Sequence, residues 1–306
     1  YIYHFPDGNA SIARLLVRRL IPQVAPGQDM EDIVAARFNY DRLDESGSSV
    51  RLRLGSTATH VSHLGSAESA EEVQVTYVRG DRAERIRAKQ CVLACYSVMI
   101  PHLCPQLPSP QKEALSSLVR APLIYTSVAL RNWRGFAEKN VGWAFCPGLD
   151  HQAAALDFPV SLGSQTYSAN PNEPILVHLE GSPLQVGSGL TPREQYRAAR
   201  AQMLTTPFED MERSIRSQLA GLLSGSEFDP ARDIEGITVN RWGHGYSFRY
   251  RPQFDSGYDG EESPHIVGRQ RVGRISIANC DAGASASIGA AIDQAHRAIT
   301  EISSNI

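Results

Sequence analysis

The chain has 306 residues, 42% of them hydrophobic and 21% charged, with a formal net charge of −3 at pH 7. This length and composition suit a globular protein with one large domain or two ordinary ones. The weak negative charge gives no electrostatic reason to expect a nucleic-acid partner. No apolar run approaches the ~18 residues that a membrane-spanning helix needs.

The first hundred residues predict one helix followed by strands. Apolar residues recur at helical spacing over 9–20, with Asn9 as a candidate N-cap and Pro22 just beyond the end. Apolar runs and alternation predict strands at 29–42, 50–54, 73–77, 84–89 and 91–95.

The middle of the chain mixes both kinds of element. Strands are expected at 123–130, 141–146, 175–180 and 237–242, and helices at 111–119, 192–203 and 208–223. Pro207 separates the last two helices, and a loop rich in Gly and aromatic residues runs to about residue 268.

The cysteines and the basic residues give little sign of a site. Cys91 and Cys95 would lie ~13 Å apart along a strand, too far to share a zinc ion, so we expect core cysteines and no metal. Of 30 basic residues only Lys89, Lys112 and Lys139 are lysine. We interpret the arginine excess as GC-rich coding and not as an arginine-built site. The sequence contains no G-x-S-x-G, P-loop or H-E-x-x-H motif.

The closing segment carries the strongest pattern. An apolar run at 275–277 leads to Asp281, a turn of small residues follows at 282–287, and a helix is predicted from Ile288. Its expected apolar face comprises Ile288, Ala291, Ile292, Ala295, Ile299 and Ile302. A strand, a small-residue turn and a helix N-terminus together present free backbone N–H groups to an anion or to the polar edge of a flat cofactor.

This segment, 275–302, resembles the C-terminal flavin-binding stretch of the FAD-dependent amine oxidase superfamily. Segments 3–18, 130–133, 156–163 and 240–246 resemble its bacterial spermidine dehydrogenase branch. Members of that superfamily hold the FAD pyrophosphate with a G-x-G-x-x-G turn, which is absent from this sequence. We therefore expect the C-terminal portion of a flavoprotein: a fragment, a processed chain, or a subunit whose partner chain supplies the G-x-G-x-x-G segment.

The resemblance implies a mixed α/β fold of α+β character. Part of an FAD-binding Rossmann-like domain would be interleaved with a mixed-sheet substrate domain. The FAD-binding portion would comprise 1–20, 45–105 and 268–306, and the substrate domain 21–44 and 106–267.

The resemblance also implies a set of FAD contacts. Asp281 would bond a ribityl hydroxyl or a phosphate-side group; the alternative is that it caps the last helix. The backbones of Gly283, Ala284, Ser285 and Ala286 would face the pyrimidine edge of the flavin.

Two weaker matches concern the remainder of the dinucleotide. The backbone of Val61 would contact adenine, and Ala94 would end a strand that passes near the cofactor.

On the substrate side, the resemblance points to Trp242, His244 and Tyr246 as catalytic candidates. The aromatic rings would wall the site and attract a cation, and His244 would donate a hydrogen bond to the substrate. The alternative is a strand and turn packed with ordinary core aromatics and a structural histidine.

One departure from the family concerns oxygen. Many amine oxidases carry a lysine near flavin N5, whereas the corresponding strand here holds Thr126 and Ser127. This favours a dehydrogenase with another electron acceptor. The resemblance adds heme as a second candidate cofactor, with no favoured axial ligand among His4, His60, His63, His102 and His178.

The leading hypothesis is therefore FAD-dependent oxidation of a C–N bond in a polyamine-like amine, by hydride transfer to flavin, giving an imine and then an aldehyde. The alternatives are a non-catalytic subunit of a two-chain flavoprotein, and a biosynthetic relative that acts on a bulkier amine. For the location of the protein, the bacterial periplasm and the cytoplasm both stay open from the sequence.

Overall fold

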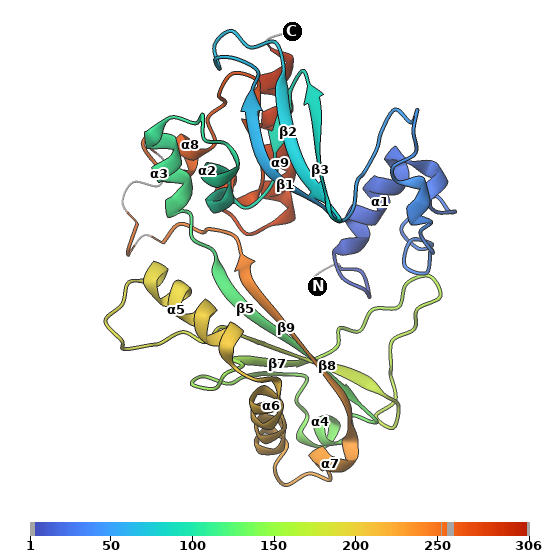
Figure 1. The fold of residues 1–306 in the computed structure, drawn as a ribbon. Coiled ribbons are helices and arrows are strands. Elements are labelled where there is room, and N and C mark those ends of the chain that lie inside the picture. Colours follow the sequence, from blue (N-terminus) through green and yellow to red (C-terminus); the bar gives the residue numbers. More distant parts are fainter. Residues whose placement is uncertain (1–3, 252, 256–259, 305–306) are drawn as a thin grey trace. The chain divides into compact units, whose positions relative to one another are not determined.

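A computed structural model describes residues 4–251, 253–255 and 260–304 (Figure 1). The helices are α1 (Ala10–Leu20), α2 (Ile100–Leu103), α3 (Ser109–Ser117), α4 (Arg134–Lys139), α5 (Pro192–Thr205), α6 (Phe208–Leu222), α7 (Pro230–Asp233), α8 (Pro264–Gly268) and α9 (Ile288–Ser303). The strands are β1 (Ser56–His63), β2 (Val73–Arg79), β3 (Arg82–Ala88), β4 (Cys91–Leu93), β5 (Ala121–Leu130), β6 (Trp143–Phe145), β7 (Ala153–Leu156), β8 (Ile175–Gly181), β9 (Ile234–Tyr246) and β10 (Ile275–Ile277). None of the described helices is long and apolar enough to cross a bilayer.

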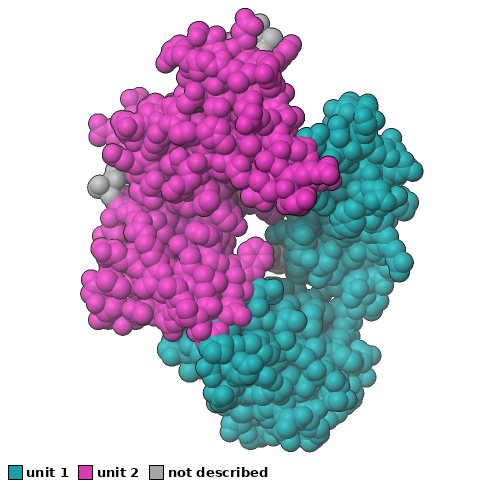
Figure 2. Space-filling view, in the orientation of Figure 1, with its two compact units in different colours: residues 1–54, 124–181, 207–240 teal, residues 55–123, 182–206, 241–306 magenta. Residues whose placement is uncertain are grey.

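The chain forms two compact units, coloured separately in Figure 2. Unit 1 comprises 1–54, 124–181 and 207–240, and unit 2 comprises 55–123, 182–206 and 241–306. The mixed α/β fold expected from the sequence is confirmed. Each compact unit is built from three separate stretches of the chain. The assignment of particular segments to an FAD domain and a substrate domain stays a prediction.

Unit 1 is built on a five-stranded sheet with the order β6-β7-β8-β5-β9. Every second residue of β5 is buried, which is the period of a strand with one face in a core. Leu179 of β8 and Val128 of β5 belong to the same buried cluster as Ile215 and Leu219 of α6. The apolar stripe of α6 therefore covers this face of the sheet.

The predicted strand at 29–42 is wrong, because that segment folds around a buried arginine. Arg18, at the end of α1, donates to the carbonyls of Pro26 and Asp29 and pairs with Asp32. Asp32 in turn accepts from backbone N–H groups of the same loop. These bonds replace the ladder that a strand would need.

Two neighbouring predictions also need correction. The alternation at 50–54 forms no strand, and its apolar side chains are exposed. Strand pairing begins at Ser56, opposite Arg79. Asn9 does not cap α1, because its backbone is already helical and its side chain accepts no capping hydrogen bond.

Unit 2 contains an antiparallel sheet, β1-β2-β3, and a parallel pair, β10-β4. The strand expected at 91–95 is shorter than predicted and pairs with β10. Val61, Leu93 and Ile277 share one buried cluster, so both sheets contribute to the same core.

The last helix departs from its expected packing. Ile288, Ile292 and Ile299 of α9 are exposed, with 56% of Ile292 accessible. Ala298 is the buried residue of this helix. The apolar stripe predicted from the sequence therefore exists, but no described part of the chain buries it.

Candidate functional site

The turn between β10 and α9 is held by its own side chains. The Asn279 Oδ1 accepts from the N–H groups of Asp281 and Ala282 at 2.7 and 3.2 Å, which shapes the 3₁₀ turn η4 (Cys280–Gly283). Ala284 follows in the left-handed region with φ 46°. Ser287 then caps α9 by accepting from the Ala290 N–H.

This arrangement leaves backbone donors unused. Ala284 N–H bonds to the Asp281 carbonyl and Ser285 N–H to the Cys280 carbonyl. By contrast, the N–H groups of Ala286, Ile288 and Gly289 bond to no described residue. Unpaired N–H groups at the start of a 16-residue helix attract negative charge.

Asp281 lies fully buried beneath the turn. One carboxylate oxygen accepts from Phe248 N–H at 3.0 Å. The other accepts from Ser97 N–H at 3.2 Å and from Arg120 at 2.9 Å. The alternative that Asp281 caps the last helix is wrong, because Ser287 does so. Its contact with FAD stays a prediction.

Two aromatic rings pack next to the buried Asp281–Arg120 ion pair. The Arg120 guanidinium lies 4.1 Å from the centre of the Tyr96 ring, and the His244 ring lies 5.5 Å from the same ring. Burial and the nearby positive charges of Arg200 and Arg120 lower the pKa of His244, so this ring is neutral at pH 7. Its Nδ1 is buried without a described partner.

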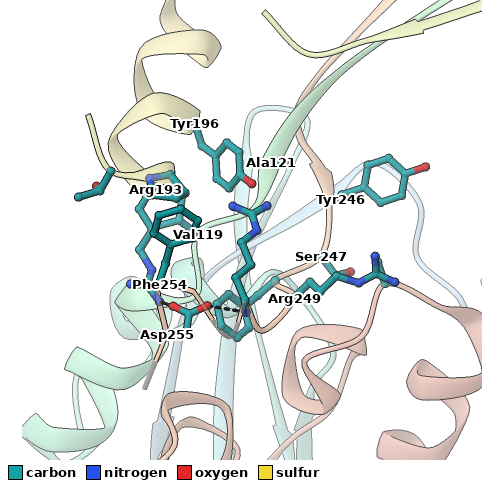
Figure 3. A pocket seen from close by; sticks show the side chains of 14 residues that line it. Val119, Ala121, Arg193, Tyr196, Tyr246, Ser247, Arg249, Phe254 and Asp255 are labelled. Atoms are coloured by element: carbon teal, nitrogen blue, oxygen red, sulfur yellow. Dashed lines mark hydrogen bonds and ion pairs between the residues drawn. The ribbon is translucent and has the colours of Figure 1, made fainter. Parts of the chain in front are cut away.

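A cavity of about 640 Å³ opens in unit 2 beside the turn (Figure 3). Its lining residues are Val119, Ala121, Thr191, Pro192, Arg193, Tyr196, Tyr246, Ser247, Phe248, Arg249, Arg251, Phe254, Asp255 and Ala286. Ala286 comes from the turn and Tyr246 from the end of β9. The cavity thus joins the proposed flavin segment to the proposed substrate segment, and its volume is in the range of small-molecule sites.

One ion pair organises the cavity wall. Arg193 binds one oxygen of Asp255 at 2.6 Å, and the Arg251 N–H donates to the other at 2.9 Å. The Arg251 guanidinium lies 4.7 Å from the centre of the Tyr196 ring. Burial lowers the pKa of Arg251, although an arginine remains charged at pH 7.

The structure brings together only part of the predicted site. Tyr246 and Ala286 line the cavity, whereas Trp242 and His244 do not. Trp242 is 54% exposed. Gly283, Ala284 and Ser285 lie in the turn, as expected from the sequence.

The two adenine-side candidates lie elsewhere in unit 2. Val61 belongs to β1, and its side chain is buried in the core of unit 2, so only its backbone is left to contact a ligand. Ala94 is exposed and precedes Cys95, whose carbonyl accepts a hydrogen bond from the Asn279 side chain. Ala94 is therefore next in sequence to a residue that contacts the turn.

The sequence reasoning missed the cavity's arginines, Arg193, Arg249 and Arg251. A signal was present in the Arg-x-Arg pair at 249 and 251, which begins three residues beyond the end of the 240–246 segment. Because 27 of the 30 basic residues are arginine, this pair does not stand out from the rest of the chain.

The remaining candidates lie in hydrogen-bonded settings. Thr126 bonds the buried His151 at 2.8 Å, and Ser127 contacts His178, which also pairs with Asp157 at 3.1 Å. The ring nitrogens of His63 contact Gln106 and the Val272 carbonyl. Two of the five candidate heme ligands, His63 and His178, thus have ring nitrogens that already bond the protein.

The fold is of the amine oxidase type. The structure is similar to that of a putrescine oxidase variant from a redesign of cofactor binding, with 15% identity, a TM-score of 0.57, and 85% of this chain and 50% of that chain covered. For putrescine oxidase bound to putrescine the values are 15%, 0.52, 76% and 46%. For cyclohexylamine oxidase from Brevibacterium oxydans they are 13%, 0.53, 90% and 51%.

This chain therefore spans about half the length of these proteins. No protein-family model matches the sequence. No curated protein sequence matches it either. At such low identity the likeness shows a shared fold, and the substrates named are those of the similar enzymes.

Proposed function

We propose that this protein takes part in FAD-dependent oxidation of a C–N bond in an amine. The observation that carries the proposal is the turn at the start of α9. There, Ala286, whose N–H bonds to no described residue, lines a cavity that Tyr246 also lines, and the unused N–H groups of Ile288 and Gly289 follow it in the chain. The similarity of the fold to putrescine and cyclohexylamine oxidases supports the same reaction class.

The residues of this turn fit a flavin. The N–H groups of Ala286, Ile288 and Gly289 would hold an electron-rich edge or a phosphate of the cofactor. The small side chains at 283–286 let a flat ring approach the backbone. When bound there, the flavin would supply the chemistry by accepting a hydride from the carbon next to the nitrogen.

The chain's own residues would hold and orient the substrate. Tyr246 gives an aromatic wall on the cavity side of the turn. Asp281 and Arg120 would act by positioning, because their buried pair fixes the turn relative to Phe248. His244, neutral and packed on Tyr96, would support the backbone that carries Tyr246.

We further propose a dehydrogenase rather than an oxidase. Thr126 and Ser127 stand where the resemblance places the oxygen-assisting lysine, and both contact histidines. We expect a dye to accept electrons faster than oxygen does. Heme is not part of this proposal.

A further polypeptide segment would complete the flavin site. The exposed Ile288, Ile292 and Ile299 form an apolar stripe on α9, beside a parallel sheet of only two described strands. Parallel strands are normally covered on both faces. We infer that a segment with a G-x-G-x-x-G turn, on the same or another chain, packs here.

The test compares two variants of one residue. Ile288 is the first residue of α9, and Ser287 before it is extended, so a proline at 288 suits the backbone and removes one N–H. Ile288→Ala loses side-chain bulk but keeps the N–H. We expect Ile288→Pro to weaken FAD binding by about tenfold relative to Ile288→Ala, measured by flavin fluorescence on the protein isolated with its bound partners.

The activity arm uses the same preparation. Amines are offered with a redox dye or oxygen, and aldehyde is measured as the product. A preparation that retains its partners yet binds no flavin and oxidises no amine would contradict the proposed function.

A further inference from the structure

The electrostatics of the cavity point to a substrate property that the resemblance does not. Three arginines and one aspartate line it: Arg193, Arg249, Arg251 and Asp255. Both oxygens of Asp255 are already engaged, one by the Arg193 guanidinium and one by the Arg251 N–H. The carboxylate therefore offsets Arg193 and leaves two guanidinium charges on the cavity wall.

Those two charges have no described anionic partner. Arg249 forms no hydrogen bond or ion pair with any described residue, and the Arg251 guanidinium contacts the Tyr196 ring but no carboxylate within ion-pair distance. The ring fixes Arg251 without neutralising it, and the planar fork of its N–H groups suits a carboxylate. An anionic group is the natural complement.

A polycation fits this wall poorly. Each ammonium group of a polyamine would meet like charges across a partly desolvated space, which raises its binding free energy. Aromatic side chains form the rest of the wall, among them Tyr196, Tyr246, Phe248 and Phe254. Such a surface suits an apolar body between the amine and the acid.

We propose that the amine oxidised by this protein carries a carboxylate that Arg249 and Arg251 bind, so that the substrate is an amino acid or a similar amino-carboxylate and not a polyamine. This inference rests on the proposed function for the reaction, but the binding of the anion stands on the cavity alone. Arg249 and Arg251 would then determine specificity and would hold the acid end of the substrate while its nitrogen-bearing end faces the turn.

Two pairs of probes separate the carboxylate from the rest of the ligand. L-Phenylalanine and 2-phenylethylamine differ only by a carboxylate, as do L-ornithine and putrescine. We expect the acid of each pair to bind the full chain at least about tenfold more tightly than its decarboxylated partner, measured by titration calorimetry. The aromatic pair matches the cavity wall and the second pair tests the polyamine alternative directly.

Variants assign the preference to particular side chains. Arg249→Gln changes an exposed residue, so the fold should be retained, and Arg251→Gln removes the charge over Tyr196. Each should reduce the preference for the acid by about tenfold. Arg197→Gln is the matched control, because Arg197 is an exposed arginine of α5 that does not line the cavity. It should leave the preference unchanged.

The outcomes separate this inference from the proposed function. 3-Phenylpropionate, which has no amine, should also bind with the same dependence on Arg249 and Arg251. That result supports the anion site even in a preparation that binds no flavin. Equal or tighter binding of putrescine and 2-phenylethylamine would overturn the inference, as would a preference that survives both cavity variants or is lost equally in Arg197→Gln.

Discussion

His151 should make unit 1 sensitive to mild acid. This side chain is 2% exposed, and its Nε2 shares a hydrogen bond of 2.8 Å with Thr126. Burial lowers its pKa from 6.5 to about 4. Above pH 6.5 the ring is neutral in both the folded and the unfolded chain. As the pH falls from 6.5 towards 4, only the unfolded chain takes up the proton, so stability is lost across that window.

The size of the effect follows from this difference in pKa. The free energy of unfolding should fall by about 1.4 kcal/mol per pH unit inside the window, reaching about 2 kcal/mol at pH 5 and about 3 kcal/mol at pH 4. The perturbation is His151→Gln, which keeps an amide near Thr126 but does not titrate. The variant should be less stable than the parent at pH 7 and should lose less on acidification.

Urea unfolding followed by circular dichroism from pH 4 to pH 8 measures both effects. Other titrating groups contribute to both proteins and cancel in the comparison. Thr126→Val is the control: it removes the hydrogen bond but keeps His151, so it should lower stability by a similar amount at every pH. Parallel pH profiles for the parent and His151→Gln would refute the reasoning.

Three further changes test the turn and its surroundings. Arg120→Leu leaves the Asp281 carboxylate buried without its cation and should cost about 3–5 kcal/mol, read from the urea midpoint; a loss below about 1 kcal/mol would show that the pair is not buried. Gly245→Ala places a methyl group 2.5 Å from the Leu123 Cβ, so the melting temperature should fall by an amount equivalent to about 1–3 kcal/mol. Ile292→Glu changes an exposed position of α9, so the chain's own stability should stay within about 0.5 kcal/mol of the parent's. FAD retention in the intact assembly should weaken. Unchanged FAD retention would contradict the inference that a further segment packs on this helix.

Long elements with strong local signals were predictable. The helices predicted at 192–203 and 208–223 are confirmed as α5 and α6. They could be predicted because each has amphipathic spacing and Pro207 separates them. By contrast, β7 (Ala153–Leu156) was missed. It begins with three alanines, which favour strands weakly, and it forms because β6 and β8 pair with it on either side.

Isolated patterns misled for the same reason. The alternating residues at 50–54 have no partner strand among the described residues, and without a partner an alternating sequence forms no β-ladder. The candidate site shows a similar division. The turn before α9 follows from adjacent residues, whereas the cavity needs Arg193 of α5 beside Asp255 and Arg251, a proximity that no local pattern contains.

The buried carboxylate of Asp281 links four stretches of chain that are remote in sequence, through Ser97, Arg120, Phe248 and its own turn. A ligand arriving at that turn therefore meets a surface whose shape was set when the protein folded. The entropy of ordering these stretches is already lost before binding, so more of the contact energy is left to appear as affinity. Loosening this junction should consequently weaken ligand capture even where the altered side chain never touches the ligand.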